Sequence, residues 1–141
     1  MQELTVTAKI QVIVNDNEAS LLSATTSAYR DACNYVSNYV YQTRILRQFA
    51  LNQLLYNTLR KKYGLKSQMA QSVLKTVIAK YKTIIKNQNR WINAVFKRPQ
   101  YDLVWNRDYS LTQERFSVNT LDGRLKLNYH ANAMEDYRDA H

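Results

Sequence analysis

The period of the hydrophobic pattern changes twice along the chain. Over residues 3–14 apolar and polar side chains alternate, and one face collects Leu4, Val6, Ala8, Ile10, Val12 and Val14. This alternation, rich in β-branched residues, predicts a half-buried strand. Asn15 and the two residues after it then predict a turn and a helix N-cap, with Glu18 placed favourably near the helix start.

A helical period follows and continues as far as Pro99, which disfavours helical geometry at the residue before it. Spacings of three and four predict helices from Glu18 to about Arg47, from about Phe49 to Tyr63 and from about Ser67 to Val95. Gly64 fits the left-handed residue that ends the second helix. The positions expected to face the core are Leu21, Thr25, Ala28, Ala32, Tyr35, Tyr39, Leu51, Leu54, Leu55, Thr58, Leu59, Ala70, Val73, Leu74, Val77, Tyr81, Ile84 and Ile85.

Strand-like patterns return after Pro99. We expect a strand over residues 102–105, a turn over residues 107–110, and two strands, Phe116–Leu121 and Arg124–Tyr129, joined at Asp122-Gly123. The predicted fold class is therefore α+β, a small β-barrel or sheet with a three-helix insertion. Its parts are residues 1–16 (first strand), 17–98 (helices) and 99–141 (remaining strands).

Charge is distributed unevenly over the 141 residues, which suffice for one core. Lys and Arg number 20 against 11 Asp and Glu, a formal net charge of +9. No acidic residue occurs between Asp31 and Asp102, a stretch that carries thirteen basic residues. A field of one sign attracts polyanions.

Several classes of protein are excluded by composition. No run approaches the ~20 apolar residues of a membrane span, and no signal peptide is visible at the N-terminus. We therefore expect a cytoplasmic location and no membrane partner. The single cysteine, Cys33, excludes an internal disulfide framework and a cysteine-cluster zinc site, and its position predicts a buried thiol.

The third predicted helix carries a narrow polar stripe nearly opposite its apolar arc, formed by Gln68, Gln71, Lys75, Lys82 and Lys86. The stripe is either a solvated helix face or a nucleic-acid surface. The absence of acidic residues and the mixture of Gln with Lys favour the second interpretation. Lysines contact phosphates, whereas Gln side chains pair with base edges, adenine especially.

Catalytic groups are scarce in the sequence. His130 and His141 lack a third ligand at suitable spacing. Asp102, Asp108 and Asp122 fall at predicted turns or strand ends, where capping roles explain them. We expect no enzymatic activity; a metal-dependent nuclease using Asp102 and Asp108 is the weaker alternative.

Five segments, in this order, resemble the N-terminal part of the TnpB family (also called OrfB): Tyr29–Val36, Tyr63–Gln71, Val95–Pro99, Arg107–Leu111 and Leu121–Leu127. The resemblance covers nearly the whole chain. It implies the N-terminal module of a transposon-encoded, RNA-guided DNA endonuclease related to type V CRISPR effectors. The strands would form a wedge β-barrel and the helices a recognition lobe, which together hold guide RNA and its heteroduplex with DNA. The protein would also read a short motif beside the target.

The resemblance also implies roles for individual residues. Gln68, Gln71 and Lys75 would read the motif, with Tyr35 and Asn38 as neighbours on the first helix. The other expected nucleic-acid contacts are Lys82, Lys86, Arg90, Arg124 and Lys126. The implied partners are guide RNA, double-stranded target DNA, and the rest of the nuclease or a second copy of the chain.

The sequence departs from the family in one respect. The family's nuclease is a RuvC-like domain with three acidic metal ligands and a zinc ribbon with paired CxxC motifs, and neither occurs before His141. We therefore expect no cofactor in this chain, no catalysis, and an incomplete wedge with an open sheet edge. The alternative is a stand-alone interaction protein or regulator, derived from such a nuclease, that binds a protein partner.

Overall fold

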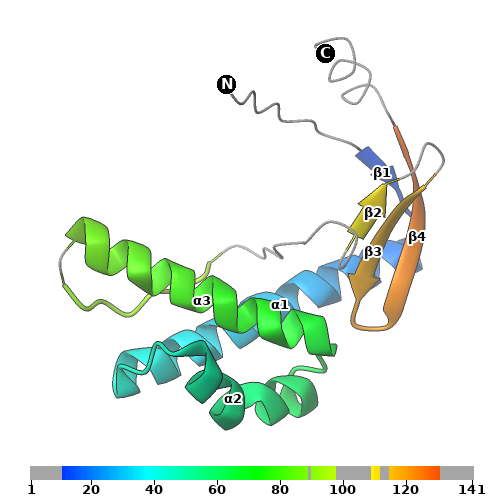
Figure 1. Cartoon of the computed structure of the whole chain (residues 1–141). Coiled ribbons are helices and arrows are strands. Elements are labelled where there is room, and N and C mark those ends of the chain that lie inside the picture. Colours follow the sequence, from blue (N-terminus) through cyan, green and yellow to red (C-terminus); the bar gives the residue numbers. More distant parts are fainter. Residues whose placement is uncertain (1–10, 89, 98–108, 112–114, 131–141) are drawn as a thin grey trace, which may run out of the picture.

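Three helices and a four-stranded antiparallel sheet make up the computed structural model, which describes residues 11–88, 90–97, 109–111 and 115–130 (Figure 1). The elements are β1 (Gln11–Ile13), α1 (Asp16–Thr43), α2 (Gln48–Lys62), α3 (Ser67–Gln88), β2 (Tyr109–Leu111), β3 (Phe116–Thr120) and β4 (Gly123–His130). The strand order is β1-β4-β3-β2. The predicted α+β class is confirmed, with an open sheet formed by the described strands.

Helix α1 begins as the sequence predicts. Asn15 Oδ1 accepts from the backbone N–H of Glu18 at 2.8 Å, and Glu18 Oε1 accepts from that of Asn15 at 3.0 Å. This reciprocal capping box satisfies two donors that the first turn leaves open. The helix ends at Thr43, before the predicted Arg47, because Arg44 takes the left-handed conformation (φ 60°).

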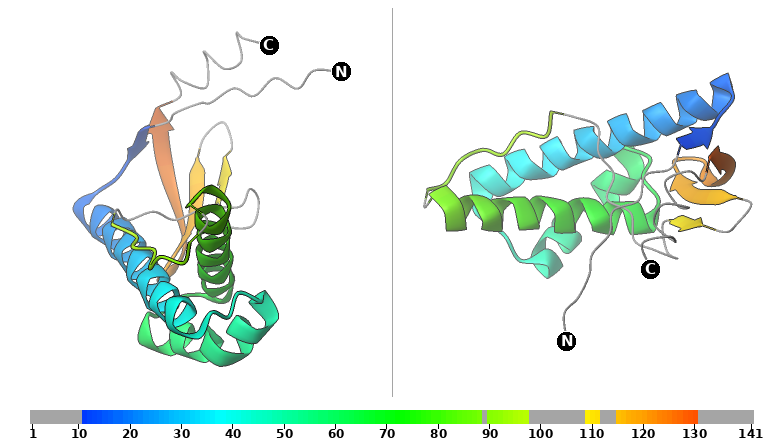
Figure 2. Two further views of the ribbon diagram at one scale, coloured as in Figure 1. Left: turned by 90° about the vertical axis from the view of Figure 1, so that its left-hand side faces the viewer. Right: turned by 90° about the horizontal axis from the view of Figure 1, so that it is seen from above.

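Helices α1 and α3 lie side by side and run in the same direction, since Tyr29 meets Ser72 and Ser37 meets Tyr81. Helix α2 packs on one side of the α1–α3 pair, and residues 91–97 cover the opposite side of the same pair (Figure 2). In this helical core the largest fully buried aliphatic and sulfur-containing side chains are Val36, Val40, Leu51, Leu59, Leu65, Met69, Val73, Leu74 and Val77. Cys33 is also buried in this core, as predicted.

Two expected core positions are wrong. Leu54 is 52% exposed because α2 contacts its neighbours through Leu51, Leu55 and Leu59, one turn apart, and Leu54 lies off that line. Ile85 is 41% exposed because it lies in the last turn of α3, beyond the part that α2 covers.

Hydroxyl groups join the elements inside this core. Tyr29 Oη lies 2.8 Å from Ser72 Oγ and 2.9 Å from Thr76 Oγ1. Tyr81 Oη donates to the carbonyl of Ser37 at 2.9 Å and accepts from the backbone N–H of Ala94 at 3.2 Å. Because buried polar groups are costly without partners, these bonds fix α1, α3 and residues 91–97 relative to one another.

The third helix is shorter than predicted. It ends at Gln88, so Arg90 lies beyond it, and residues 91–97 are not helical. The polar run before Trp91 offers no apolar residue to continue the arc of α3. The chain then buries alternate residues: Ile92, Ala94 and Phe96 are at least half-buried, and Asn93, Val95 and Lys97 are exposed. This period of two is typical of extended chain.

Asn34 of α1 holds that extended segment. Its Nδ2 donates to the carbonyl oxygen of Phe96 at 3.0 Å, and its Oδ1 accepts from the N–H of the same residue at 2.7 Å. One side chain thus satisfies both backbone polar groups of the partly buried Phe96, in place of a strand partner.

The sheet confirms the predicted hairpin. Thr120 pairs with Gly123, whose φ of +92° is strained for any residue with a side chain. The register places Val12, Phe116, Val118, Leu125, Leu127 and Tyr129 on one face. Ile13 lies on the other and is 48% exposed.

The predicted turn over residues 107–110 is partly wrong. Tyr109 and Ser110 lie in β2, where they pair with Val118 and Ser117, because β3 offers them a ladder of backbone groups. The strand predicted over residues 102–105 and the early part of the first strand lie outside the described residues.

The hairpin turn attaches the sheet to the helices (Figure 1). The N–H of Leu121 donates to Thr25 Oγ1 at 3.2 Å, and its side chain packs against the helical core. Thr25 Oγ1 in turn donates to the carbonyl of Leu21 at 2.7 Å. The end of the hairpin is thereby fixed to the first half of α1.

We predict that Asn34→Ala lowers the free energy of unfolding by about 1–3 kcal/mol, because both polar groups of Phe96 lose their partner. Urea titration followed by circular dichroism measures the change. The matched control is Asn38→Ala on the same helix, whose side chain is exposed and whose Oδ1 accepts from Gln42. Equal stabilities of the two variants would contradict the role given to Asn34.

Candidate nucleic-acid interface

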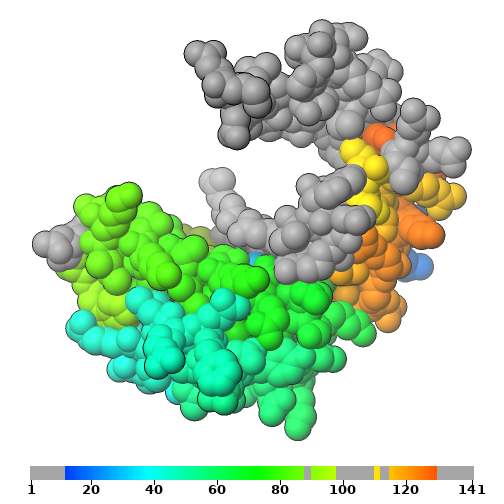
Figure 3. Space-filling model, in the orientation of Figure 1, coloured from blue at the N-terminus to red at the C-terminus, as the bar shows by residue number. Residues whose placement is uncertain are grey.

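The start of α2 and the exposed side of α3 enclose a groove. Its main hollow has a volume of about 670 Å³ and is lined by Leu46, Arg47, Gln48, Phe49, Lys75, Ile78, Ala79 and Lys82. A second hollow of about 410 Å³ is lined by Gln48, Phe49, Asn52 and Gln71. Because Gln48 and Phe49 line both hollows, the two adjoin; together they are called the α2–α3 groove. The surfaces of these elements meet on the face shown in Figure 3.

Three of the predicted contact residues lie along one wall of this groove. Gln71, Lys75 and Lys82 are four and seven residues apart on α3, so they share one side of the helix. They extend over about 16 Å at 1.5 Å per residue. Three residues of the polar stripe predicted from the sequence therefore form one continuous side of α3, and α2 borders that side.

Phe49 stands where the two hollows meet. Its side chain is 67% exposed, the most exposed of the large apolar residues described. It lies one residue into α2, on a different side of the helix from the buried Leu51, Leu55 and Leu59. An exposed aromatic ring thus lies beside Arg47, Lys75 and Lys82.

The smaller hollow contains a pair of amides. Gln71 Nε2 donates to Asn52 Oδ1 at 2.6 Å, which joins α3 to α2 and fixes both side chains. Gln71 Oε1 remains as an acceptor and Asn52 Nδ2 as a donor. A single Asn or Gln side chain recognises the edge of an adenine with one acceptor and one donor. Here Gln71 supplies the acceptor and Asn52 the donor.

Further along the same two helices, Tyr56 connects to Ser67. Tyr56 Oη donates to Ser67 Oγ at 2.9 Å and accepts from Arg60 Nη1 at 3.0 Å. The Ser67 hydroxyl, which can turn its proton toward the phenolate, and then Arg60 lower the pKa of Tyr56. The Arg60 guanidinium also lies 5.8 Å from the centre of the Tyr56 ring.

Charge along the groove is of one sign. Neither α2 nor α3 carries an acidic residue. Lys75, Lys82 and Lys86 are all exposed on α3, and Arg47 and Arg60 are exposed on the side of α2. Repulsion between these cations is relieved by counter-ions or by a bound polyanion.

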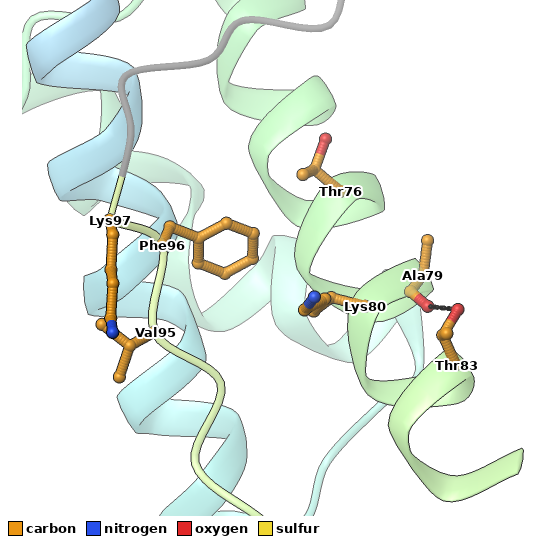
Figure 4. A pocket seen from close by; sticks show the side chains of 7 residues that line it. All are labelled: Thr76, Ala79, Lys80, Thr83, Val95, Phe96 and Lys97. Atoms are coloured by element: carbon orange, nitrogen blue, oxygen red, sulfur yellow. Dashed lines mark hydrogen bonds between the residues drawn. The ribbon is translucent and has the colours of Figure 1, made fainter. Parts of the chain in front are cut away.

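A further basic hollow lies on the neighbouring face of α3, against residues 95–97, and measures about 590 Å³ (Figure 4). Ala79 lines both this hollow and the larger hollow of the α2–α3 groove. Lys80 and Lys97 line it together with Thr76 and Thr83. The ring of Phe96 points across it toward α3 (Figure 4). Positive charge therefore continues around the helix, although no described aromatic ring is as exposed there as Phe49.

Other predicted site residues do not line the groove. Tyr35 is half-buried, its ring 5.8 Å from that of Tyr63, with Lys62 Nζ 5.0 Å from the Tyr35 centroid. Asn38 is exposed on α1 and lines neither hollow. Neither Tyr35 nor Asn38 therefore lines the groove together with Gln71 and Lys75, beside which they were expected.

The remaining predicted residues lie at the margins or elsewhere. Gln68 and Lys86 are exposed on α3, near its first and last turns. Arg90 is exposed but lies past the helix. Arg124 and Lys126 lie on β4, on its polar face. The Arg124 guanidinium donates to Ser117 Oγ at 2.6 Å and Asn119 Oδ1 at 3.2 Å, so it braces β4 against β3.

Sequence reasoning missed Arg47, Phe49 and Asn52. A signal was present: Phe49 does not fit the apolar arc of the second helix and lies two residues after an arginine. The pattern does not determine beside which side of α3 the start of α2, and with it Phe49, comes to lie.

Comparison with known proteins identifies no relative: no protein-family model, curated protein or solved structure matches the chain. Among the described residues no helix is long and apolar enough to cross a membrane. No cluster of three or more His, Cys, Asp or Glu side chains suited to a metal ion occurs in the same part of the chain.

We predict that Tyr56 ionises at lower pH than an ordinary tyrosine and that Ser67→Ala moves its pKa back upward. Loss of the hydroxyl removes the hydrogen bond that contributes most to lowering the pKa of Tyr56. Difference absorbance of phenolate between the wild type and the variant during alkaline titration measures the shift. Superimposable titrations would contradict the assignment; Tyr56→Phe identifies the signal.

Proposed function

We propose that this chain is a nucleic-acid-binding module with no catalytic activity of its own, and that the α2–α3 groove is its principal contact surface. The observation that carries the proposal is the juxtaposition of Lys75, Lys82 and Arg47 around an exposed aromatic ring. Cations bind phosphates and rings bind bases, and nucleic acid supplies both along one strand.

Charge supports nucleic acid over a protein partner. A protein ligand would need a long acidic segment to balance a surface without carboxylates on either helix. The alternative, an interaction protein that uses its open sheet edges, makes a different prediction. It requires affinity for RNA and DNA close to nil at ~0.1 M salt, where screening is moderate.

We further propose that the module comes from a TnpB-like RNA-guided endonuclease, where it would hold guide RNA and target-adjacent DNA. The order of one strand, three helices and a hairpin supports this, together with the five segments that resemble the family. The reading frame after His141 tests it. An acidic RuvC-type set with CxxC pairs would support the proposal, and an unrelated domain there would contradict it.

We predict that Lys75→Ala reduces the salt dependence of nucleic-acid binding by one contact. The slope of log K against log salt should become shallower by about 0.7–0.9. Fluorescence anisotropy with labelled oligonucleotides at several salt concentrations measures the slope.

The matched control is Lys61→Ala, which removes the same charge from α2 at an exposed position that lines neither hollow. Its slope should equal that of the wild type. If Lys75→Ala and Lys61→Ala behave alike, binding is a property of net charge and the groove is not the site.

A further inference from the structure

We infer that the α2–α3 groove binds single-stranded nucleic acid, with an unpaired base stacked on Phe49. This inference rests on the proposed function. It specifies the kind of nucleic acid that the groove binds, namely unpaired nucleotides and not a duplex. The geometry at the meeting point of the two hollows supports it in three steps.

The first step concerns the ring. Phe49 is 67% exposed in an otherwise well-packed helical unit, so its position is not explained by the core. Hollows adjoin it on both sides, and Gln48 and Phe49 form their common wall. A flat base fits beside such a wall. Bases inside a duplex have both faces covered by their neighbours, so only an unpaired base or a strand end can use the ring.

The second step concerns the backbone of the strand. Arg47, Lys75 and Lys82 line the larger hollow with the ring and are exposed. A nucleotide stacked on Phe49 therefore has cations within reach for its phosphates. Stacking on an aromatic ring within a basic groove is the combination by which proteins hold single strands.

The third step concerns the base edge. Asn52 and Gln71 line the smaller hollow beside Phe49. Their amides are joined by the hydrogen bond of 2.6 Å from Gln71 Nε2 to Asn52 Oδ1. The pair offers one acceptor and one donor to the edge of a base next to the stacked one.

A binding experiment with the full chain tests the inference. The probes are labelled oligodeoxyuridylate, labelled oligouridylate, a blunt duplex of mixed sequence, and inorganic polyphosphate as a polyanion without bases. The variants are Phe49→Ala and, as the matched control, Leu54→Ala. Leu54 is also on α2 and is 52% exposed, but it lines neither hollow.

We expect Phe49→Ala to weaken binding of both single strands by roughly tenfold, the loss of one stacked base. Leu54→Ala should bind them like the wild type. Binding of polyphosphate should be unchanged in both variants and that of the duplex nearly so, because polyphosphate has no bases and the duplex exposes base faces only at its two ends. The more tightly bound of the two oligonucleotides identifies the sugar.

Phe49→Trp supplies a direct measurement of stacking. Its added indole fluorescence, taken as the difference from the wild type, should be quenched by the oligonucleotides and not by polyphosphate. An unquenched indole, or an unchanged affinity of Phe49→Ala, overturns the inference but not the proposed function. An equal loss of duplex binding also overturns it. If the wild type binds none of the nucleic acids, the proposed function itself fails.

Discussion

The hydroxyl of Tyr81 joins three segments of the chain: α1, α3 and residues 91–97. The packing of the other parts of the helical unit depends on this junction. The hydroxyl donates to the Ser37 carbonyl on α1 and accepts from the N–H of Ala94. Two helices that run in the same direction cannot be joined by a short hairpin. The chain between α1 and α3 must therefore run back along α1 before α3 begins. Helix α2 makes the first return and residues 91–97 pass back along the opposite side.

This arrangement decides where the groove can form. Because one side of the α1–α3 pair is covered by residues 91–97, α2 packs on the other, where its buried leucines meet the apolar arc of α3 and its start borders the polar stripe. Its antiparallel course brings Asn52 to Gln71 and Tyr56 to Ser67. The start of α2 then stands beside Lys75 and Lys82. Positive charge that helix α3 would otherwise present on a convex surface thus lies in a concavity with an aromatic wall, which focuses its field.

Sequence reasoning predicted the helical and strand regions well where a single period held over many residues. The apolar arc of α3, except for Ile85, and the helix N-cap at Asn15 are local features, and both are confirmed. The end of α3 was wrong because Trp91 and Phe96 suit either a helix or an extended chain, and Asn34 selects the latter from 62 residues away. Arg124, a predicted nucleic-acid contact, donates to Ser117 Oγ on β3, a bond within the sheet that the sequence pattern did not indicate.

The sequence by itself determined the periods, the caps, the hairpin and the one-sided charge, because each depends on residues near one another in the chain. It therefore determined the basic stripe of α3. Only the tertiary structure decided what borders that stripe, since side-chain rows on different helices meet according to how their apolar faces pack. Phe49 and Asn52 entered the groove for that reason, whereas Tyr35 and Asn38 did not.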